Sequence, residues 1–233
     1  MFSTQEDCMS GIPSGVLDAW GDHALPLSYA VWRRNEALLL TRLLGGYGAS
    51  LPRVADVGCG PCRILTDIGQ LVSAFTGFDR DAASLSAAQT QFGRDTRFSF
   101  VGPAAYEAHF DGPGTRDNPF DLVICLGNTL GILAGDPKLH VERMARASRA
   151  IFLSIIGRGV LPLREDYYRQ NGIAFEVDPV TETIRSDMWG ESRAWDIEGC
   201  MELASGLGTM GFRDVSIIPV LPMGYALHAA RID

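Results

Sequence analysis

The chain has 233 residues, of which 46% are hydrophobic and 21% are charged, and its formal net charge is -8. This composition suits a single globular domain over residues 1–233 and excludes a disordered chain. The acidic balance disfavours nucleic acid as a partner, because phosphates would be repelled.

Features that would place the chain in or across a membrane are missing from the sequence. No apolar run reaches the roughly 18–20 residues that span a bilayer, and residues 1–15 lack the regions of a signal peptide. Five cysteines in so long a chain do not make a disulfide framework. We therefore expect a cytoplasmic protein without a membrane partner, and a homodimer is left open.

Strands and helices alternate along the first two thirds of the chain. Apolar residues at helical spacing, followed by Gly45 and Gly46, predict a helix over residues 29–44. Short apolar runs predict strands at 53–57, 75–79, 98–101, 120–126 and 150–156. Helices are predicted over 62–75, after Asp81 as an N-cap, and over 138–147. This alternation predicts a doubly wound α/β fold around a mostly parallel sheet.

The last third of the chain departs from this alternation. A helix at 195–208 and two strands at 215–220 and 225–232 predict a C-terminal antiparallel hairpin, which brings the sheet to seven strands. Residues 158–195 are an insertion with alternating segments around Asp178-Pro179. We expect them to form a small β-hairpin cap over the carboxyl edge of the sheet, with residues 1–45 acting as an N-terminal lid segment.

The segment VADVGCGPCRIL, residues 54–65, fits two kinds of site. Cys59 and Cys62 have the spacing of a redox dithiol, whereas Gly58 and Gly60 form a turn at which backbone can approach a ligand. Asp79, at the end of the second strand, is placed to accept hydrogen bonds from both hydroxyls of a ribose. Because Pro61 follows in place of a third glycine, the turn favours a nucleoside without phosphate over a dinucleotide.

Redox and metal chemistry are the weaker alternatives for this turn. A redox domain of this type is about half as long as the chain and carries an aromatic residue before its first cysteine, where Gly58 stands here. A zinc site would need two further ligands at compact spacing, and the four histidines, residues 23, 109, 140 and 228, are isolated. We therefore predict no metal.

Three segments carry a family resemblance. VADVGCGPCRIL and FTGFDRD resemble motif I and the second-strand acid of class I S-adenosylmethionine-dependent methyltransferases. FDLVICLGNTLGIL, residues 120–133, resembles the fourth-strand motif, nearest to the glycine/sarcosine N-methyltransferase branch. The resemblance covers residues 30–157, and the tail by topology alone. It implies a Rossmann-like methyltransferase fold, S-adenosyl-L-methionine as the cofactor, and transfer of a methyl group to a nitrogen of a small-molecule acceptor such as an amino acid, amine or natural product.

Other functions remain open at this point. The same fold and cofactor would serve an O-methyltransferase of a natural-product or carboxylate acceptor. They would also serve a cofactor-binding regulator without catalysis, because a fold does not fix a function. NAD(P)-dependent reduction is a further alternative from a different enzyme class.

The resemblance also implies roles for individual residues around the cofactor. Asp79 would hold the ribose and Arg80 would flank the adenine. The acid that the family usually has after the third strand is missing from residues 100–105, so backbone at Ala104 is the expected adenine contact. Tyr29 and Arg33 would close a helix over the methionyl end. The full cofactor-binding set is Tyr29, Arg33, Asp56, Gly58, Cys59, Gly60, Asp79, Arg80, Ala104, Leu126, Gly127 and Thr129.

Candidates for the acceptor side come from the N-terminal segment and the insertion. Asn128 and Tyr29 are the catalytic candidates, although Asn128 would also serve as a cap of the following helix. The substrate-binding candidates are Trp20, Asn128, Tyr167, Tyr168 and Trp195. For each of the aromatic residues, ordinary core packing is the competing interpretation.

Overall fold

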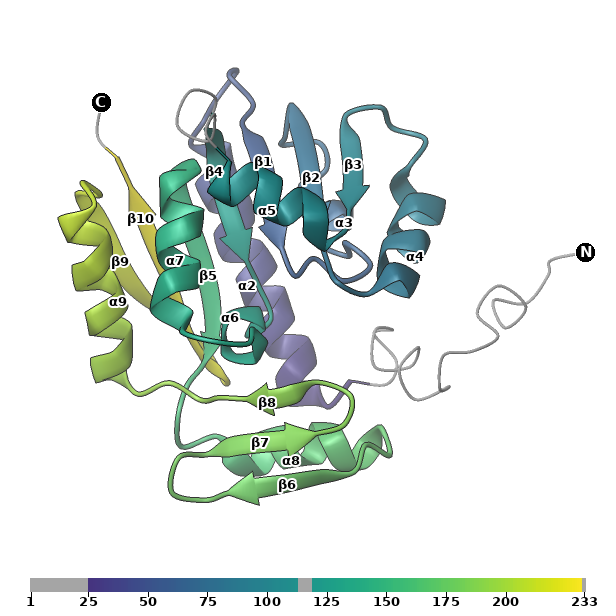
Figure 1. Cartoon of the computed structure of the whole chain (residues 1–233), viewed down its shortest axis with the longest axis vertical. Coiled ribbons are helices and arrows are strands. Elements are labelled where there is room, and N and C mark those ends of the chain that lie inside the picture. Colours follow the sequence, from purple (N-terminus) through teal and green to yellow (C-terminus); the bar gives the residue numbers. More distant parts are fainter. Residues whose placement is uncertain (1–24, 113–118, 232–233) are drawn as a thin grey trace, which may run out of the picture.

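The computed structural model describes residues 25–112 and 119–231, and a seven-stranded sheet runs through them (Figure 1). The strand order is β3-β2-β1-β4-β5-β10-β9, in which β10 is antiparallel to both of its neighbours and the first five strands are parallel. The strands are β1 (Arg53–Val57), β2 (Ala74–Phe78), β3 (Phe98–Val101), β4 (Phe120–Cys125), β5 (Ser148–Ile156), β9 (Asp214–Val220) and β10 (Gly224–Ala230). The expected doubly wound α/β fold with a C-terminal antiparallel pair is confirmed.

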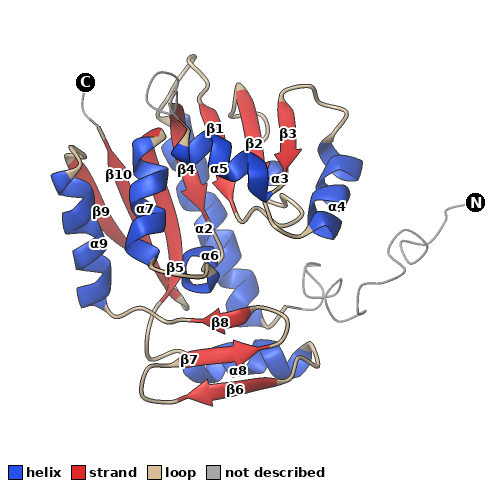
Figure 2. Cartoon of the chain, in the orientation of Figure 1, coloured by secondary structure: helices blue, strands red, loops and turns tan. Residues whose placement is uncertain are grey.

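Helices cover both faces of the sheet, as the strands and flanking helices of Figure 2 show. One apolar cluster packs beneath α2 (Leu27–Gly45), α3 (Leu65–Ile68) and α4 (Ala82–Phe92). The other packs beneath α5 (Pro103–Asp111), α7 (Pro137–Arg146) and α9 (Ile197–Thr209), with the short α6 (Thr129–Ile132) after β4. Leu122 and Val123, adjacent on β4, are fully buried in different clusters. Strands of this kind need apolar residues on both faces, which explains their continuous apolar runs.

Acidic N-caps fix where several helices begin. Asp81 accepts hydrogen bonds from the backbone N–H of Ala83 and of Ser84, at 3.2 and 3.1 Å, so α4 starts where the sequence predicts. The helix expected over residues 62–75 is wrong, because only Leu65–Ile68 is helical. Cys62 has a left-handed backbone with φ 55°, which a right-handed helix cannot include.

The insertion forms a cap that is larger than the expected hairpin. It contains α8 (Leu161–Gln170) and a three-stranded antiparallel sheet of β6 (Phe175–Asp178), β7 (Thr183–Ser186) and β8 (Gly190–Ser192). The β6–β7 pair turns at Asp178-Pro179, as predicted. A lone hairpin is only marginally stable, and here β8 and α8 complete it by enclosing Ile184 and Tyr168. In Figure 1 the cap lies beyond the carboxyl ends of β1 and β4.

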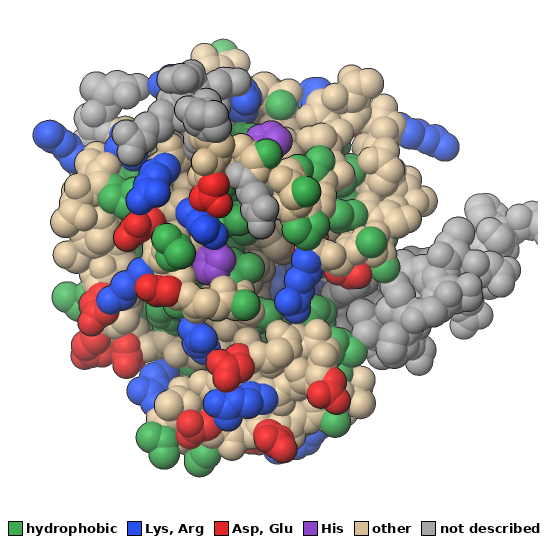
Figure 3. All heavy atoms as spheres, in the orientation of Figure 1, with side chains coloured by type: hydrophobic (Ala, Val, Ile, Leu, Met, Phe, Trp, Pro, Cys, Tyr) green, Lys and Arg blue, Asp and Glu red, His purple; other side chains and the backbone are tan. Residues whose placement is uncertain are grey.

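The outer surface carries charges of both signs. On the face drawn in Figure 3, Lys and Arg side chains are interspersed with Asp and Glu side chains. Within the described ranges, no helix combines the length and apolar character needed to cross a membrane.

Candidate active site

A cavity of about 860 Å³ is lined by residues that follow the parallel strands β1, β2 and β4 and by residues of the cap. Three parts of the chain line it: the glycine turn after β1, the segment after β4, and side chains from α2 and the cap. Its size falls within the range of small-molecule sites. Ligands of open α/β sheets bind at this edge, next to the first strand.

The glycine turn needs both of its glycines for their backbone conformation. Gly58 and Gly60 have φ values of 73° and 53°, which L-residues with a side chain rarely adopt. Gly58 also lies against Thr129, whose Cγ2 would be only 2.2 Å from a Cβ added to the glycine. The backbone N–H groups of Gly58 and Cys59 both donate to the Phe78 carbonyl, at 2.8 and 3.0 Å, so the turn is attached to the end of β2.

Asp79 bridges the glycine turn and the start of α4. Its Oδ2 accepts the Gly60 N–H at 2.7 Å, and its Oδ1 accepts the Asp81 N–H at 2.9 Å. A carboxylate oxygen can accept more than one hydrogen bond, so both oxygens keep capacity for a ligand. Asp79 is half-buried in the cavity wall. The arrangement therefore orients a carboxylate at the position where the sequence predicts ribose binding.

The two cysteines of the turn are packed as core thiols. Both sulfur atoms lie against Gly77 on β2, where an added Cβ would be 2.8 Å from the Cys59 sulfur and 2.7 Å from the Cys62 sulfur. The hydrogen bond with Cys62, together with burial, raises the pKa of Cys59. A redox dithiol requires a lowered thiol pKa. The geometry thus favours packing over thiol chemistry.

Two buried carboxyl groups also line the cavity, and the sequence analysis identified only one of them. Asp56, on β1, was expected near the cofactor, whereas Glu36, on α2, was missed. Burial raises the pKa of both groups, and the neighbouring Glu36 contributes to the rise at Asp56. Glu36 gave one sequence signal, since an acid among the apolar positions of a helix is unusual.

Aromatic rings form the wall between α2 and the cap. Tyr29 stacks on Tyr167 with ring centroids 4.7 Å apart, and Tyr168 packs edge-on against Tyr167. Burial raises the pKa of Tyr29, and it raises the pKa of Tyr167 to about 12. Met188 and Trp189, which the sequence analysis missed, extend this wall from the cap. These phenols stay protonated at neutral pH and can donate hydrogen bonds.

Asn128 links the segment after β4 to the cap. Its Nδ2 donates to the Arg193 carbonyl at 3.1 Å, and its Oδ1 accepts the Ile156 N–H at 3.0 Å. Gly131 permits this contact, because an added Cβ would lie 2.6 Å from Asn128 Nδ2 and 2.8 Å from the Arg193 carbonyl oxygen. Although Asn128 lines the cavity, its side chain is engaged by protein atoms. That arrangement favours a positioning role over direct contact with substrate.

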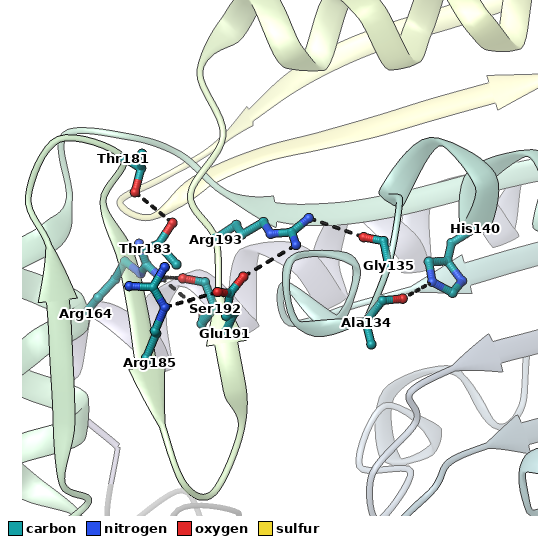
Figure 4. Close-up of polar contacts among 10 residues, drawn as sticks. All are labelled: Ala134, Gly135, His140, Arg164, Thr181, Thr183, Arg185, Glu191, Ser192 and Arg193. Carbon is teal, nitrogen blue, oxygen red and sulfur yellow. Dashed lines mark hydrogen bonds and ion pairs between the residues drawn. The ribbon is translucent and has the colours of Figure 1, made fainter.

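Polar contacts hold the cap together and join it to the loop between α6 and α7 (Figure 4). Arg164, fully buried on α8, donates to the Ser192 carbonyl at 2.5 Å and to the Ser192 hydroxyl at 3.1 Å. Arg193 reaches the Gly135 carbonyl at 3.4 Å. His140 lies beside this contact on α7; its Nε2 is 2.8 Å from the Ala134 carbonyl, and the residue lines the cavity.

The structure brings most of the predicted site residues together. All of the expected cofactor-binding residues except Ala104 line the cavity, and so do Asn128, Tyr167 and Tyr168. Pro103 and Tyr106 line it near the position expected of Ala104, which is exposed. Trp195 is half-buried against the apolar cluster beneath α9 and does not line the cavity. Trp20 lies outside the described residues. No group of three His, Cys, Asp or Glu residues suited to a metal ion occurs in the described ranges.

Comparison with known proteins finds a family model that matches part of the chain. Residues 54–150, which run from β1 into β5, match the family model described as "Methyltransferase domain". Over these residues the chain is similar to that family. The expectation of a methyltransferase enzyme that uses S-adenosylmethionine is thereby confirmed from the family match and the fold together. No curated protein matches the chain by sequence.

Solved structures share the fold of this methyltransferase at low sequence identity. Magnesium protoporphyrin IX methyltransferase from Synechocystis PCC 6803, with bound SAH, is 14% identical over 94% of each chain, with a TM-score of 0.61. The PH0226 protein from Pyrococcus horikoshii is 18% identical over 95% of this chain and all (100%) of its own, with a TM-score of 0.60. The sugar N-methyltransferase KedS8 from a Streptoalloteichus species is 14% identical over 85% of this chain and 87% of its own, with a TM-score of 0.57. These likenesses show a common architecture.

Proposed function

We propose that this methyltransferase transfers the methyl group of S-adenosylmethionine to a nitrogen atom of a small-molecule acceptor. Asp79 holds the ribose, Arg80 flanks the adenine, and Tyr29 and Arg33 enclose the methionyl end. The cap of residues 158–195 selects the acceptor, while α2 closes the cofactor end. The rest of the expected lid segment, residues 1–24, lies outside the described residues. The enzyme acts in the cytoplasm.

The observation that carries the proposal is that one half of the cavity is polar and the other half is aromatic. Asp79 and the glycine turn form a polar half that suits a ribose without phosphate. Tyr167, Tyr168 and Trp189 form an aromatic half that suits the apolar body of a small acceptor. A cavity of about 860 Å³ is large enough for two small molecules side by side.

The chemistry of the wall favours an amine as the acceptor. S-adenosylmethionine carries its methyl group on a sulfonium sulfur. When the methyl group is transferred, the leaving group is a neutral thioether, which needs no protonation by an acid. The protein then has to align the acceptor and exclude water. A neutral amine needs no general base, and the wall offers phenols with raised pKa values, which are poor bases at neutral pH. The resemblance of the CLGN segment, residues 125–128, to glycine and sarcosine N-methyltransferases points the same way.

O-methylation is the alternative, and one observation favours it. An oxygen nucleophile requires a base, and His140 is a histidine that lines the cavity. Replacing His140 by Asn would abolish O-methylation and leave methylation of a neutral amine largely unchanged.

The test is methyl transfer from labelled S-adenosylmethionine to extract metabolites, followed by paired acceptors that differ only in an amine or a hydroxyl. Labelled N-methyl products from the amine member support the proposal. Label that appears only on the hydroxyl member would replace it with O-methylation. A protein that binds the cofactor but never transfers the label would be a regulator. Calorimetric titration with NADH and NADPH tests the reductase alternative, which predicts that one of these nucleotides binds.

A further inference from the structure

Arg63 lines the cavity from the segment that follows the glycine turn. Cys62 has a left-handed backbone, with φ 55°, and its buried sulfur lies against Gly77 of β2. Arg63 comes next in the chain, is half-buried and borders the cavity. Within the described residues, no hydrogen bond or ion pair engages its guanidinium group. A guanidinium group carries five N–H donors, so Arg63 is available to a ligand that brings hydrogen-bond acceptors.

The charge of Arg63 reaches both halves of the cavity. On the polar side, burial raises the pKa of Glu36 and of Asp56, and the charge of Arg63 opposes that rise. On the aromatic side, burial raises the pKa of Tyr167 to about 12, and the charges of Arg33 and Arg63 oppose it. Arg63 therefore stands where the two halves meet, within electrostatic reach of the aromatic wall.

Another guanidinium group lies behind the aromatic half. Arg164 of α8 is fully buried, and its partners are the Glu182 carbonyl and the carbonyl and hydroxyl of Ser192. All three are neutral acceptors, while the Glu182 carboxylate accepts the Gly159 N–H at 2.9 Å. Within the described residues, no carboxylate forms an ion pair with Arg164. Because charges act more strongly in a poorly hydrated interior, Arg164 makes the potential beside Ser192, a residue of the cavity wall, more positive.

The acidic side chains that line the cavity come from outside the cap. They belong to α2, β1, α3 and the turn after β2, and they are Glu36, Asp56, Asp67, Asp79 and Asp81. In the part of the chain that the structure describes, the cap contributes only uncharged lining residues, which are Tyr167, Tyr168, Met188, Trp189 and Ser192. The acceptor half is thus the basic part of the cavity, in a chain whose formal net charge is -8.

We propose that Arg63 binds a carboxylate group of the methyl acceptor, which is then an amine with an apolar or aromatic body and an acidic group. The inference rests on the proposed function, because it assigns the acceptor class of the same cavity. A guanidinium group and a carboxylate form two parallel hydrogen bonds of fixed geometry, so the pair orients the acceptor as well as holding it. No covalent bond changes when the pair forms, and the amine is directed toward the methyl group.

The cofactor also has a carboxylate, and the proposed function assigns it to Arg33. S-adenosylmethionine carries one carboxylate, at its methionyl end, whereas two guanidinium groups of the cavity, those of Arg33 and Arg63, act on Tyr167. One guanidinium group is therefore left for an acid that the acceptor brings. Tyr168 and Trp189 supply the flat surfaces that suit the apolar body of such an acceptor.

The test is labelled methyl transfer to extract metabolites before and after treatment with acidic methanol. This treatment converts carboxylates into neutral methyl esters and leaves amines in place. We expect transfer by the full-length protein to fall by about tenfold or more after esterification, and saponification of the esters should restore it. Label that persists on the esterified extract would overturn the acidic acceptor and leave N-methylation intact. Absence of transfer to the untreated extract would overturn the proposed function, and this inference with it.

Arg63→Gln assigns the loss to one side chain. It should slow labelling of the untreated extract by about tenfold or more, and the residual transfer should no longer respond to esterification. Its affinity for S-adenosylhomocysteine, measured by calorimetry, should equal that of wild type. Arg169→Gln is the matched control, because it removes an exposed cation of α8 that does not line the cavity. That control should show the wild-type rate and the wild-type response to esterification.

Three outcomes would overturn the role of Arg63 without touching the methyltransferase assignment. The first is a wild-type rate of labelling by folded Arg63→Gln. The second is weaker S-adenosylhomocysteine binding by Arg63→Gln with unchanged binding of methylthioadenosine, which lacks the amino-acid moiety, because Arg63 would then hold the cofactor carboxylate. Should Arg63→Gln not fold, Arg63→Lys decides the question, since it keeps the charge and loses the paired hydrogen bonds. A wild-type rate in Arg63→Lys is the third such outcome.

Discussion

Substituting alanine for Gly58 tests whether the tight approach of the glycine turn to Thr129 is a structural requirement. The φ of 73° places the new side chain in the left-handed region, at a cost of about 1–2 kcal/mol. The added Cβ would also lie 2.2 Å from Thr129 Cγ2 and 2.8 Å from its Oγ1, so something must move. Overpacking of this kind costs about 1–3 kcal/mol more. We therefore expect Gly58→Ala to lower the free energy of unfolding by about 2–5 kcal/mol.

Gly60 provides the matched control within the same turn. Its φ is 53°, but an added Cβ would meet no atom within 4 Å, so Gly60→Ala should cost only the backbone strain of about 1–2 kcal/mol. Thr129→Ala removes the two closest atoms, and in that background Gly58→Ala should cost about as much as Gly60→Ala. Urea denaturation of these four variants and wild type measures these differences. Equal costs at both glycines, or no relief from Thr129→Ala, would refute the close-contact explanation.

Three further predictions concern the cavity. Asp79→Ala should weaken S-adenosylhomocysteine binding by about 1.5–3 kcal/mol, the range for a hydrogen bond to a charged group; unchanged affinity in calorimetry would place the ribose elsewhere. Replacing Cys59 and Cys62 together by Ala should leave most methyl transfer intact, and a folded but inactive protein would instead indicate thiol chemistry. Trp189→Ala should raise the KM for the acceptor while the KM for S-adenosylmethionine stays constant. A parallel rise in both would show that Trp189 does not belong to the acceptor side alone.

Much of the parallel sheet was predictable from short-range signals. Apolar runs buried on both faces, such as β4, have few interpretations other than a central strand, and an acidic N-cap such as Asp81 fixes a helix start within a few residues. The glycine turn and Asp79 were also accessible, because left-handed glycines and an acid after a strand are local features. The prediction of a helix over 62–75 was wrong because the feature that prevents it has no local sequence signal. Nothing in the sequence showed that Cys62, a residue with a side chain, adopts a left-handed backbone.

The cap and the long-range contacts of the site could not be predicted in this way. The third strand and the helix of the cap form because a hairpin alone buries too little apolar surface. Asn128 was expected to face the reaction space, but its partners are Arg193 and Ile156, which lie far along the chain. Hydrogen bonds of this kind depend on the tertiary packing of segments that are distant in the sequence, so local sequence patterns do not predict them.

The order of residues thus determined the fold class and the cofactor edge of the sheet through local periodicity and turn geometry. The chemical type of the enzyme came from the resemblance of three segments to a methyltransferase family. Only the tertiary structure decided that Glu36 and Asp56 line the same cavity, that both thiols of the turn are packed against β2, and that the cap closes over an aromatic wall. The physical reason is that burial, and with it the pKa of a carboxyl or thiol group, is set by neighbours contributed from the whole chain.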